Sequence, residues 1–82
     1  MTHEEIMDIV QRIFRDVFDD DSLIITDSTN SADIEDWDSL EHITLVVTME
    51  KEFDLKFDLK EVNSLANVGE MVDLIASKLK EK

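Results

Sequence analysis

The sequence contains no cysteine and no proline, and its single glycine is Gly69. Without cysteine, the chain can form neither a disulfide framework nor a thiolate metal site. It also has no thiol of its own, so any thiol chemistry would need a sulfur supplied by a prosthetic group. The absence of proline and the near absence of glycine favour helices over a turn-rich β fold.

Long apolar runs are missing as well. No stretch of the 82 residues approaches the roughly 20 apolar residues that cross a bilayer. The opening run MTHEEIMDIV carries acids where a secretory signal carries basic residues. We therefore expect a soluble, cytoplasmic, monomeric protein that does not insert into membranes. Its length predicts one domain over residues 1–82.

Basic residues are scarce, since 8 Lys and Arg face 21 Asp and Glu, giving a formal net charge of -13. Such a surface repels the phosphates of nucleic acids and anionic membranes. It attracts proteins that carry basic patches and speeds their encounter with it. A simpler interpretation is that the acids only keep a small domain soluble.

Apolar residues recur at helical spacing in several segments of the chain. The predicted helices are residues 3–18, a helix beginning at residue 38 or 39, a short helix at residues 58–64 and a helix after residue 67. Thr2 and Glu5 form a T-x-x-E capping box before the first helix, and Asp38 and Glu41 form a D-x-x-E box before the second. Together these features predict an all-α fold, a small four-helix bundle of three main antiparallel helices and one short helix.

Residues 19–37 fit no regular period and are rich in Asp, Ser, Thr and Asn, which predicts a long loop after the first helix. The apolar residues expected to pin this loop to the core are Leu23, Ile24, Ile25 and Ile34. Its acids suggest calcium, but an EF-hand loop needs ligands at set positions and a glycine at the sixth. Frames starting at Asp19 or Asp27 do not fit, so no metal site is predicted.

The second helix holds more apolar residues than one buried stripe requires. The face expected in the core holds Leu45, Val46, Met49 and Phe53. The other face holds Leu40, Ile43 and Val47. Because the second face is not needed for the core, we interpret it as a docking surface.

The segment Asp36-Trp37-Asp38-Ser39-Leu40 lies where the acidic loop meets the second helix. A serine at this position presents its hydroxyl near the helix start. Free N–H groups and the positive dipole end of a helix tolerate a phosphate there. A phosphodiester on Ser39 would therefore be compatible with its own helix. Alternatively, Asp38 and Ser39 serve only as helix caps.

The run DSLEHITLVVTMEKEFDLKF resembles the second helix of acyl carrier proteins, and Asp38-Ser39-Leu40 matches the D-S-L modification motif of that family. Phe53 and the later run NVGEMVDLI fit the same pattern, so the resemblance covers nearly the whole chain. It implies that a phosphopantetheinyl transferase attaches 4'-phosphopantetheine from coenzyme A to Ser39. The terminal thiol would then carry acyl groups as thioesters, and the protein itself would catalyse nothing.

The same resemblance implies a surface for acyl-loading, condensing and acyl-transferring enzymes that carry basic patches. By position this surface would comprise Leu40, Glu41, Ile43, Thr44 and Val47, with Asp38 beside it. The chain departs from the family pattern at Asp36, where glycine is common, and at Trp37, where a small or aliphatic residue is common. Thr44 and Lys51 stand where many fatty-acid carriers have acids. Fatty acid synthesis and specialised, polyketide-like synthesis both stay open.

Two other functions are compatible with parts of the pattern. The chain could be an unmodified acidic adaptor that binds a basic protein partner. Ser39 and His42 could also form a hydrolase dyad, although no G-x-S-x-G elbow, orienting acid or oxyanion hole can be identified. We interpret His42 as a surface residue on the docking face. Trp37 is interpreted as an anchor for the loop in preference to a recognition element.

Overall fold

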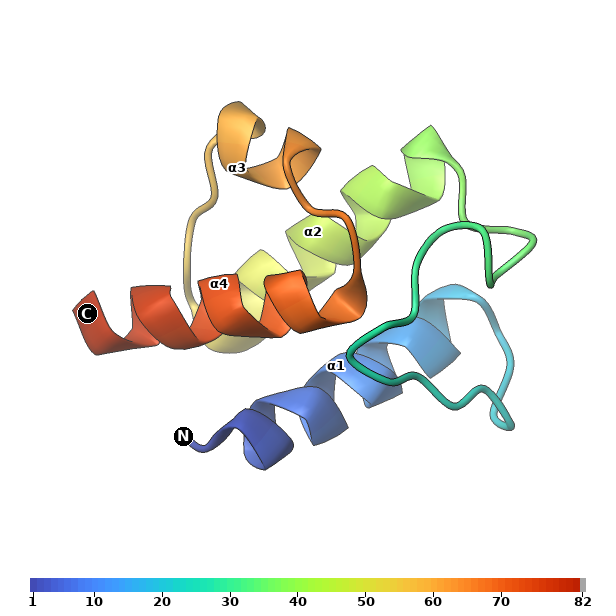
Figure 1. Ribbon diagram of the computed structural model, residues 1–82, viewed down its shortest axis with the longest axis horizontal. Helices are drawn as coiled ribbons and strands as arrows, with labels where there is room; N and C mark the ends of the chain where they lie inside the picture. Colours follow the sequence, from blue (N-terminus) through green and yellow to red (C-terminus); the bar gives the residue numbers. More distant parts are fainter. Residues whose placement is uncertain (82) are drawn as a thin grey trace.

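The computed structural model describes residues 1–81, which form helices and loops without strands. The four helices are α1 (His3–Val17), α2 (Ser39–Phe53), α3 (Leu59–Asn63) and α4 (Val68–Glu81). In Figure 1, α1 runs opposite to α2 and α4, and the short α3 lies to one side of them. The predicted all-α fold is therefore confirmed, with only small shifts in the helix bounds. The predicted antiparallel arrangement is correct for α1 against the other two main helices but wrong for α2 and α4, which run in the same direction.

The structure confirms the capping box predicted for α1 but only part of the one predicted for α2. At α1 the box is complete, because the Thr2 hydroxyl accepts from the Glu5 N–H at 3.2 Å and the Glu5 carboxylate accepts from the Thr2 N–H at 2.8 Å. The hydrogen bonds from Thr2 lower the pKa of Glu5. At α2 the box is only half formed. The Asp38 carboxylate accepts from the Glu41 N–H at 2.9 Å, but the Asp38 N–H donates to the Asp36 carbonyl at 3.1 Å. The predicted D-x-x-E box is thus wrong in its second half, and the Glu41 carboxylate takes no part in the cap.

The core lies where α1 packs against both α2 and α4. Its largest fully buried side chains include Ile6, Phe14, Leu45, Met49, Met71 and Ile75. Burying an apolar side chain of this size stabilises the fold by roughly 1.5–3 kcal/mol. The face of α2 predicted to lie in the core is buried as expected at Leu45, Val46, Met49 and Phe53.

The long loop between α1 and α2 is held to this core by part of its apolar residues. Ile25 and Ile34 are buried and Leu23 is partly buried, as predicted. Ile24 is 73% exposed, so its predicted place in the core is wrong. The neighbouring Ile25 faces the core, whereas Ile24 faces solvent.

Backbone hydrogen bonds join the loop to the start of α4. The Val68 N–H donates to the Thr29 carbonyl and the Gly69 N–H donates to the Asp27 carbonyl, each at 2.8 Å. The two segments approach so closely that a Cβ atom on Gly69 would lie 2.9 Å from the Asp27 carbonyl oxygen. The only glycine of the chain is therefore needed where the loop crosses α4.

Replacing Gly69 with alanine is expected to destabilise the protein by about 1–2 kcal/mol, measured by urea denaturation. Alanine favours a helix over glycine by about 1 kcal/mol, but the clash with the Asp27 carbonyl forces the backbone apart and weakens both hydrogen bonds. Ser77→Ala, at an exposed position of α4, is the control and should change stability little. A Gly69→Ala protein as stable as the wild type would contradict this account.

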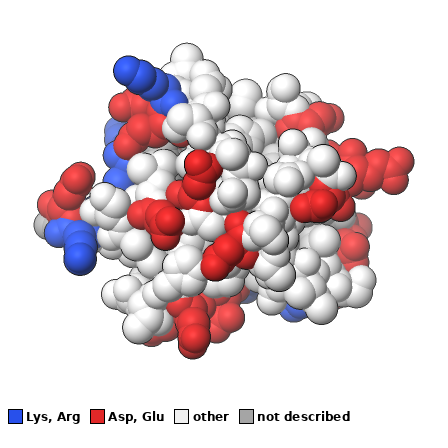
Figure 2. Space-filling view, viewed as in Figure 1, with Lys and Arg blue, Asp and Glu red and all other residues white. Residues whose placement is uncertain are grey.

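Charge is distributed unevenly over the molecule. Figure 2 shows acidic side chains across most of one face, whereas basic side chains gather mainly on the left, near α3 and the C-terminal end of α4. Within residues 1–81, no group of three or more His, Cys, Asp or Glu side chains is arranged to hold a metal ion. Over the same residues, no helix is both long enough and apolar enough to span a membrane.

Candidate modification site

Ser39 is the first residue of α2, and its side chain is exposed, as the sequence predicts. The residue before it, Asp38, is the N-cap in extended conformation, and its carboxylate binds the Glu41 N–H. The first N–H groups of a helix have no partner within the helix and carry its positive dipole end. The hydroxyl of Ser39 is therefore accessible from solvent and placed where an anionic group is favoured.

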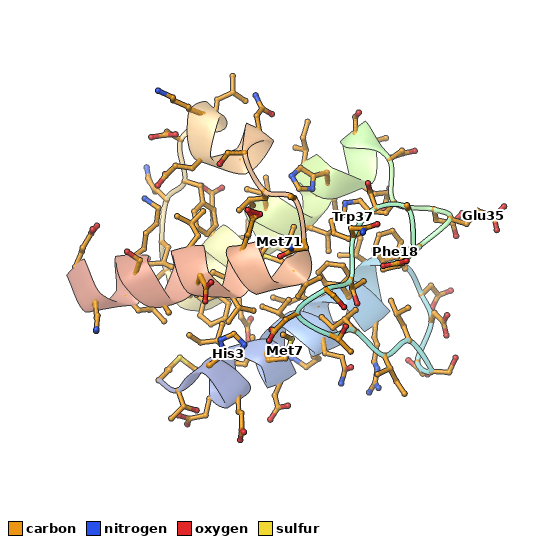
Figure 3. The ribbon with its side chains drawn as sticks, viewed as in Figure 1. His3, Met7, Phe18, Glu35, Trp37 and Met71 are labelled. Atoms are coloured by element: carbon orange, nitrogen blue, oxygen red, sulfur yellow. The ribbon has the colours of Figure 1, made fainter. Side chains whose placement is uncertain are left out.

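Trp37 connects this helix start to the core. Its ring is buried and meets the ring of Phe14 edge-on, with centroids 5.2 Å apart. Figure 3 shows Trp37 between the C-terminal end of α1 and α2, whereas Glu35, on the same loop, points outward. The interpretation of Trp37 as an anchor of the loop is confirmed, because its ring is packed inside and is not presented to a partner.

His42 follows Ser39 by three residues on α2, and its ring faces inward. Its Nδ1 accepts from the Trp37 Nε1–H at 3.2 Å, and its Nε2 lies 3.2 Å from the Val62 carbonyl of α3. Since Nδ1 accepts, we assign the proton to Nε2, which then donates to the carbonyl. The prediction of His42 as a surface residue of the docking face is wrong, because the ring is half-buried between Trp37 and α3. Both ring nitrogens are engaged, so the hydrolase hypothesis lacks a base for Ser39.

The second apolar face of α2 points to solvent as predicted. Leu40, Ile43 and Val47 are 70%, 57% and 41% exposed. Thr44 is also exposed and its hydroxyl donates to the Leu40 carbonyl at 3.1 Å, whereas Glu41 is half-buried. Exposed apolar side chains gathered beside acidic groups are typical of interaction surfaces.

A groove of about 450 Å³ lies beside Ser39, a size within the usual range of ligand sites. One wall is formed by Ser39, His42 and Ile43 of α2, and the opposite wall by Leu59, Val62 and Leu65 from α3 and the residues after it. No sequence pattern above predicted this groove. The sequence signal that could have indicated it is the three-residue spacing of Leu59, Val62 and Leu65, which all line the groove.

Polar contacts hold α3 in place against α4. The Lys78 ammonium lies 2.9 Å from the Glu61 carboxylate and 5.8 Å from the centre of the Phe57 ring. The pKa of Glu61 is lowered first by the hydrogen bond from the Asp58 N–H and then by Lys78, and the pKa of Lys78 is raised by its hydrogen bond to Glu61. Both charged forms are therefore favoured at neutral pH. This pair, together with His42, sets the position of the α3 wall of the groove.

Residues 8–75 match the family model described as a phosphopantetheine attachment site. The chain belongs to the acyl carrier protein family. It is 33% identical over 76 residues to the acyl carrier protein of Picosynechococcus sp., covering 93% of this chain and 94% of that relative. It is 30% identical over 77 residues to the acyl carrier protein of Lactobacillus acidophilus, covering 94% and 96%.

The similarity of the fold to a solved structure supports the same family assignment. The solution NMR structure of a holo acyl carrier protein from Geobacter metallireducens superposes with a TM-score of 0.86 and 45% identity, covering 92% of this chain and 86% of that one. Acyl carrier proteins are non-catalytic carriers with a phosphopantetheine prosthetic group, which meet a phosphopantetheinyl transferase and synthesis enzymes. These findings confirm the carrier interpretation and disfavour the unmodified adaptor.

Proposed function

We propose that the protein carries acyl intermediates on a 4'-phosphopantetheine arm attached to Ser39 and presents them to enzymes of fatty acid or specialised, polyketide-like synthesis. The observation that carries this proposal is an exposed hydroxyl at the first residue of α2, within the sequence Asp38-Ser39-Leu40. When attached, the group supplies a terminal thiol that holds acyl groups as thioesters. The monomeric state and cytoplasmic location expected from the sequence form part of the proposal.

The residues around Ser39 fit a phosphodiester. The positive end of α2 lowers the energy of an anion at its first turn, by about 0.3–1 kcal/mol at an exposed site. The Asp38 carboxylate is directed to the Glu41 N–H, which offsets part of its repulsion toward a second anion. Within residues 1–81, Ser39 is the only serine that begins a helix; Ser77, by comparison, lies inside α4.

The proposal is tested by treating the purified protein with coenzyme A and a broad-specificity phosphopantetheinyl transferase. We expect the intact mass to rise by one phosphopantetheine. Fragmentation of the modified peptide should then place the added mass on Ser39. Addition to another serine, or no addition with a transferase that modifies a control carrier, would contradict the assignment.

The proposed docking surface for partner enzymes comprises Leu40, Glu41, Ile43, Thr44 and Val47. Its apolar members lie next to Ser39 on the exposed face of α2, where a bound enzyme would bury them. The net charge of -13 would draw a basic patch toward it over long range. Glu41 is the acid of this surface that the helix cap leaves uncommitted.

Reversing the charge at Glu41 is expected to slow modification of Ser39. For Glu41→Lys, kcat/KM of the transferase should fall about three- to tenfold at about 10 mM salt and much less at about 1 M salt. The reason is that the screening length shrinks from about 30 Å to about 3 Å between these concentrations. Steady-state kinetics of coenzyme A transfer at several salt concentrations measure the effect.

Asp8→Lys is the matched control, because it makes the same change in net charge at an exposed position of α1. It should slow the reaction less than Glu41→Lys. If both variants slow it equally, the effect is one of net charge alone. If neither responds to salt, electrostatic docking through Glu41 is wrong.

A further inference from the structure

The groove beside Ser39 ends at a pair of stacked rings. Trp37 and His42 both line the groove, and their rings stack with centroids 5.9 Å apart and an angle of 22° between planes. On the far side Trp37 meets Phe14, which is fully buried in the core. The pair therefore stands between the groove and the hydrophobic interior.

Two hydrogen bonds hold this pair closed. One runs from the Trp37 Nε1–H to His42 Nδ1 and the other from His42 Nε2 to the Val62 carbonyl, each at 3.2 Å. They join three segments, the end of the loop, α2 and α3. A chain that passed between α2 and α3 into the core would have to break both bonds and leave the buried Trp37 indole N–H unpaired, whereas the Val62 carbonyl would keep the hydrogen bond from the Leu65 N–H. That is costly, and in residues 1–81 no buried side-chain nitrogen or oxygen lacks a partner.

We propose that the hydrogen-bonded series Trp37–His42–Val62 closes the inner end of the groove and restricts the acyl groups sheltered there to short chains. The proposal rests on the proposed function, because the acyl group would enter from Ser39 on the rim of the groove. Ile43, Leu59 and Leu65 supply apolar contacts along the walls, and the polar edges of the ring pair stop further burial. Carbons beyond this point stay in solvent, so they add nothing to the stability of the acylated protein.

The test compares the stability of the holo protein carrying butyryl, hexanoyl, octanoyl or dodecanoyl groups, by urea denaturation followed with circular dichroism. In the wild type, the free energy of unfolding should rise from the butyryl to the hexanoyl form. It should be no higher for the dodecanoyl form than for the hexanoyl form. His42→Ala removes both hydrogen bonds and opens the end of the groove. In this variant the folding equilibrium constant should keep rising with length, by up to roughly fifteenfold for each further pair of methylenes buried.

His3→Ala makes the same substitution at the other histidine, which is exposed at the start of α1, and should keep the wild-type length dependence. If His42→Ala does not fold, Trp37→Phe removes the indole N–H donor while keeping an aromatic ring, and should also extend the rise. A wild-type stability that climbs steadily to dodecanoyl would overturn the proposal, as would identical length dependence in wild type and variants. Intact mass is measured first. A protein without the added mass on Ser39 overturns the proposed function and this inference together, whereas a loaded protein without a length limit overturns only the inference.

Discussion

Replacing Ser39 with alanine is expected to abolish phosphopantetheine attachment completely while leaving the fold intact. The hydroxyl oxygen would attack the coenzyme A phosphorus that bears the pantetheine, breaking the pyrophosphate bond and releasing 3',5'-ADP, and alanine has no such oxygen. Alanine is also the best helix former, and the N-cap bond from the Glu41 N–H to Asp38 does not involve Ser39. The free energy of unfolding should therefore change by less than about 0.5 kcal/mol. Intact mass after treatment with coenzyme A and transferase, beside a urea denaturation curve, measures both.

Ser77→Ala supplies the comparison, since it removes the same hydroxyl from an exposed position inside α4. This protein should gain one phosphopantetheine at the wild-type rate. A Ser39→Ala protein that gains mass as fast as the wild type would show that the attachment site lies elsewhere. A Ser39→Ala protein that fails to fold would show that the serine is needed for the helix start, contrary to the geometry of the cap.

Local patterns explain why the helices could be predicted. The capping box of Thr2 and Glu5 begins α1 in the structure as it does in the sequence, and the period of apolar residues marks the buried side of each helix. The excess of apolar residues in α2 was informative for the same reason. A helix buries one stripe in a bundle this small, so Leu40 and Ile43 had to remain outside.

The groove and the role of His42 could not be predicted in this way, because they depend on contacts between distant segments. His42 binds a carbonyl 20 residues away, and no sequence period marks such a pair. The α2 cap shows a related limit. The pattern D-x-x-E was present, but the loop backbone at Asp36 took the Asp38 N–H that Glu41 was expected to bind. Tertiary context therefore decided which of two local partners was used.

Trp37 provides the link between the candidate site and the core, and it also makes that link measurable. It is the only tryptophan and the chain has no tyrosine, so intrinsic fluorescence reports on this one ring. The ring contacts Phe14 on one side and His42 on the other. A change in the core at Phe14 should therefore be felt at the end of the groove beside Ser39.

Phe14→Ala is expected to destabilise the protein by about 3–5 kcal/mol, which for a domain of this size is a large share of the total. Phe14 is fully buried, and its ring contacts those of Trp37 and Phe18. Truncation removes these contacts and leaves a cavity beneath Trp37. Urea denaturation followed by Trp37 fluorescence gives the free energy. The folded variant should also emit at longer wavelength, because water reaches a less tightly packed indole.

Phe18→Ala is the matched comparison, since it removes the same ring from a partly buried position at the end of α1. The loss in free energy of unfolding should be clearly smaller than for Phe14→Ala. The emission should stay close to that of the wild type, because Phe18 packs on Phe14, and Phe14 is the ring that packs on Trp37. Equal losses from the two substitutions would mean that Phe14 does not support Trp37 in particular. If instead Phe14→Ala keeps its stability but shifts the emission, the core tolerates the cavity and the helix start beside Ser39 is the part that depends on it.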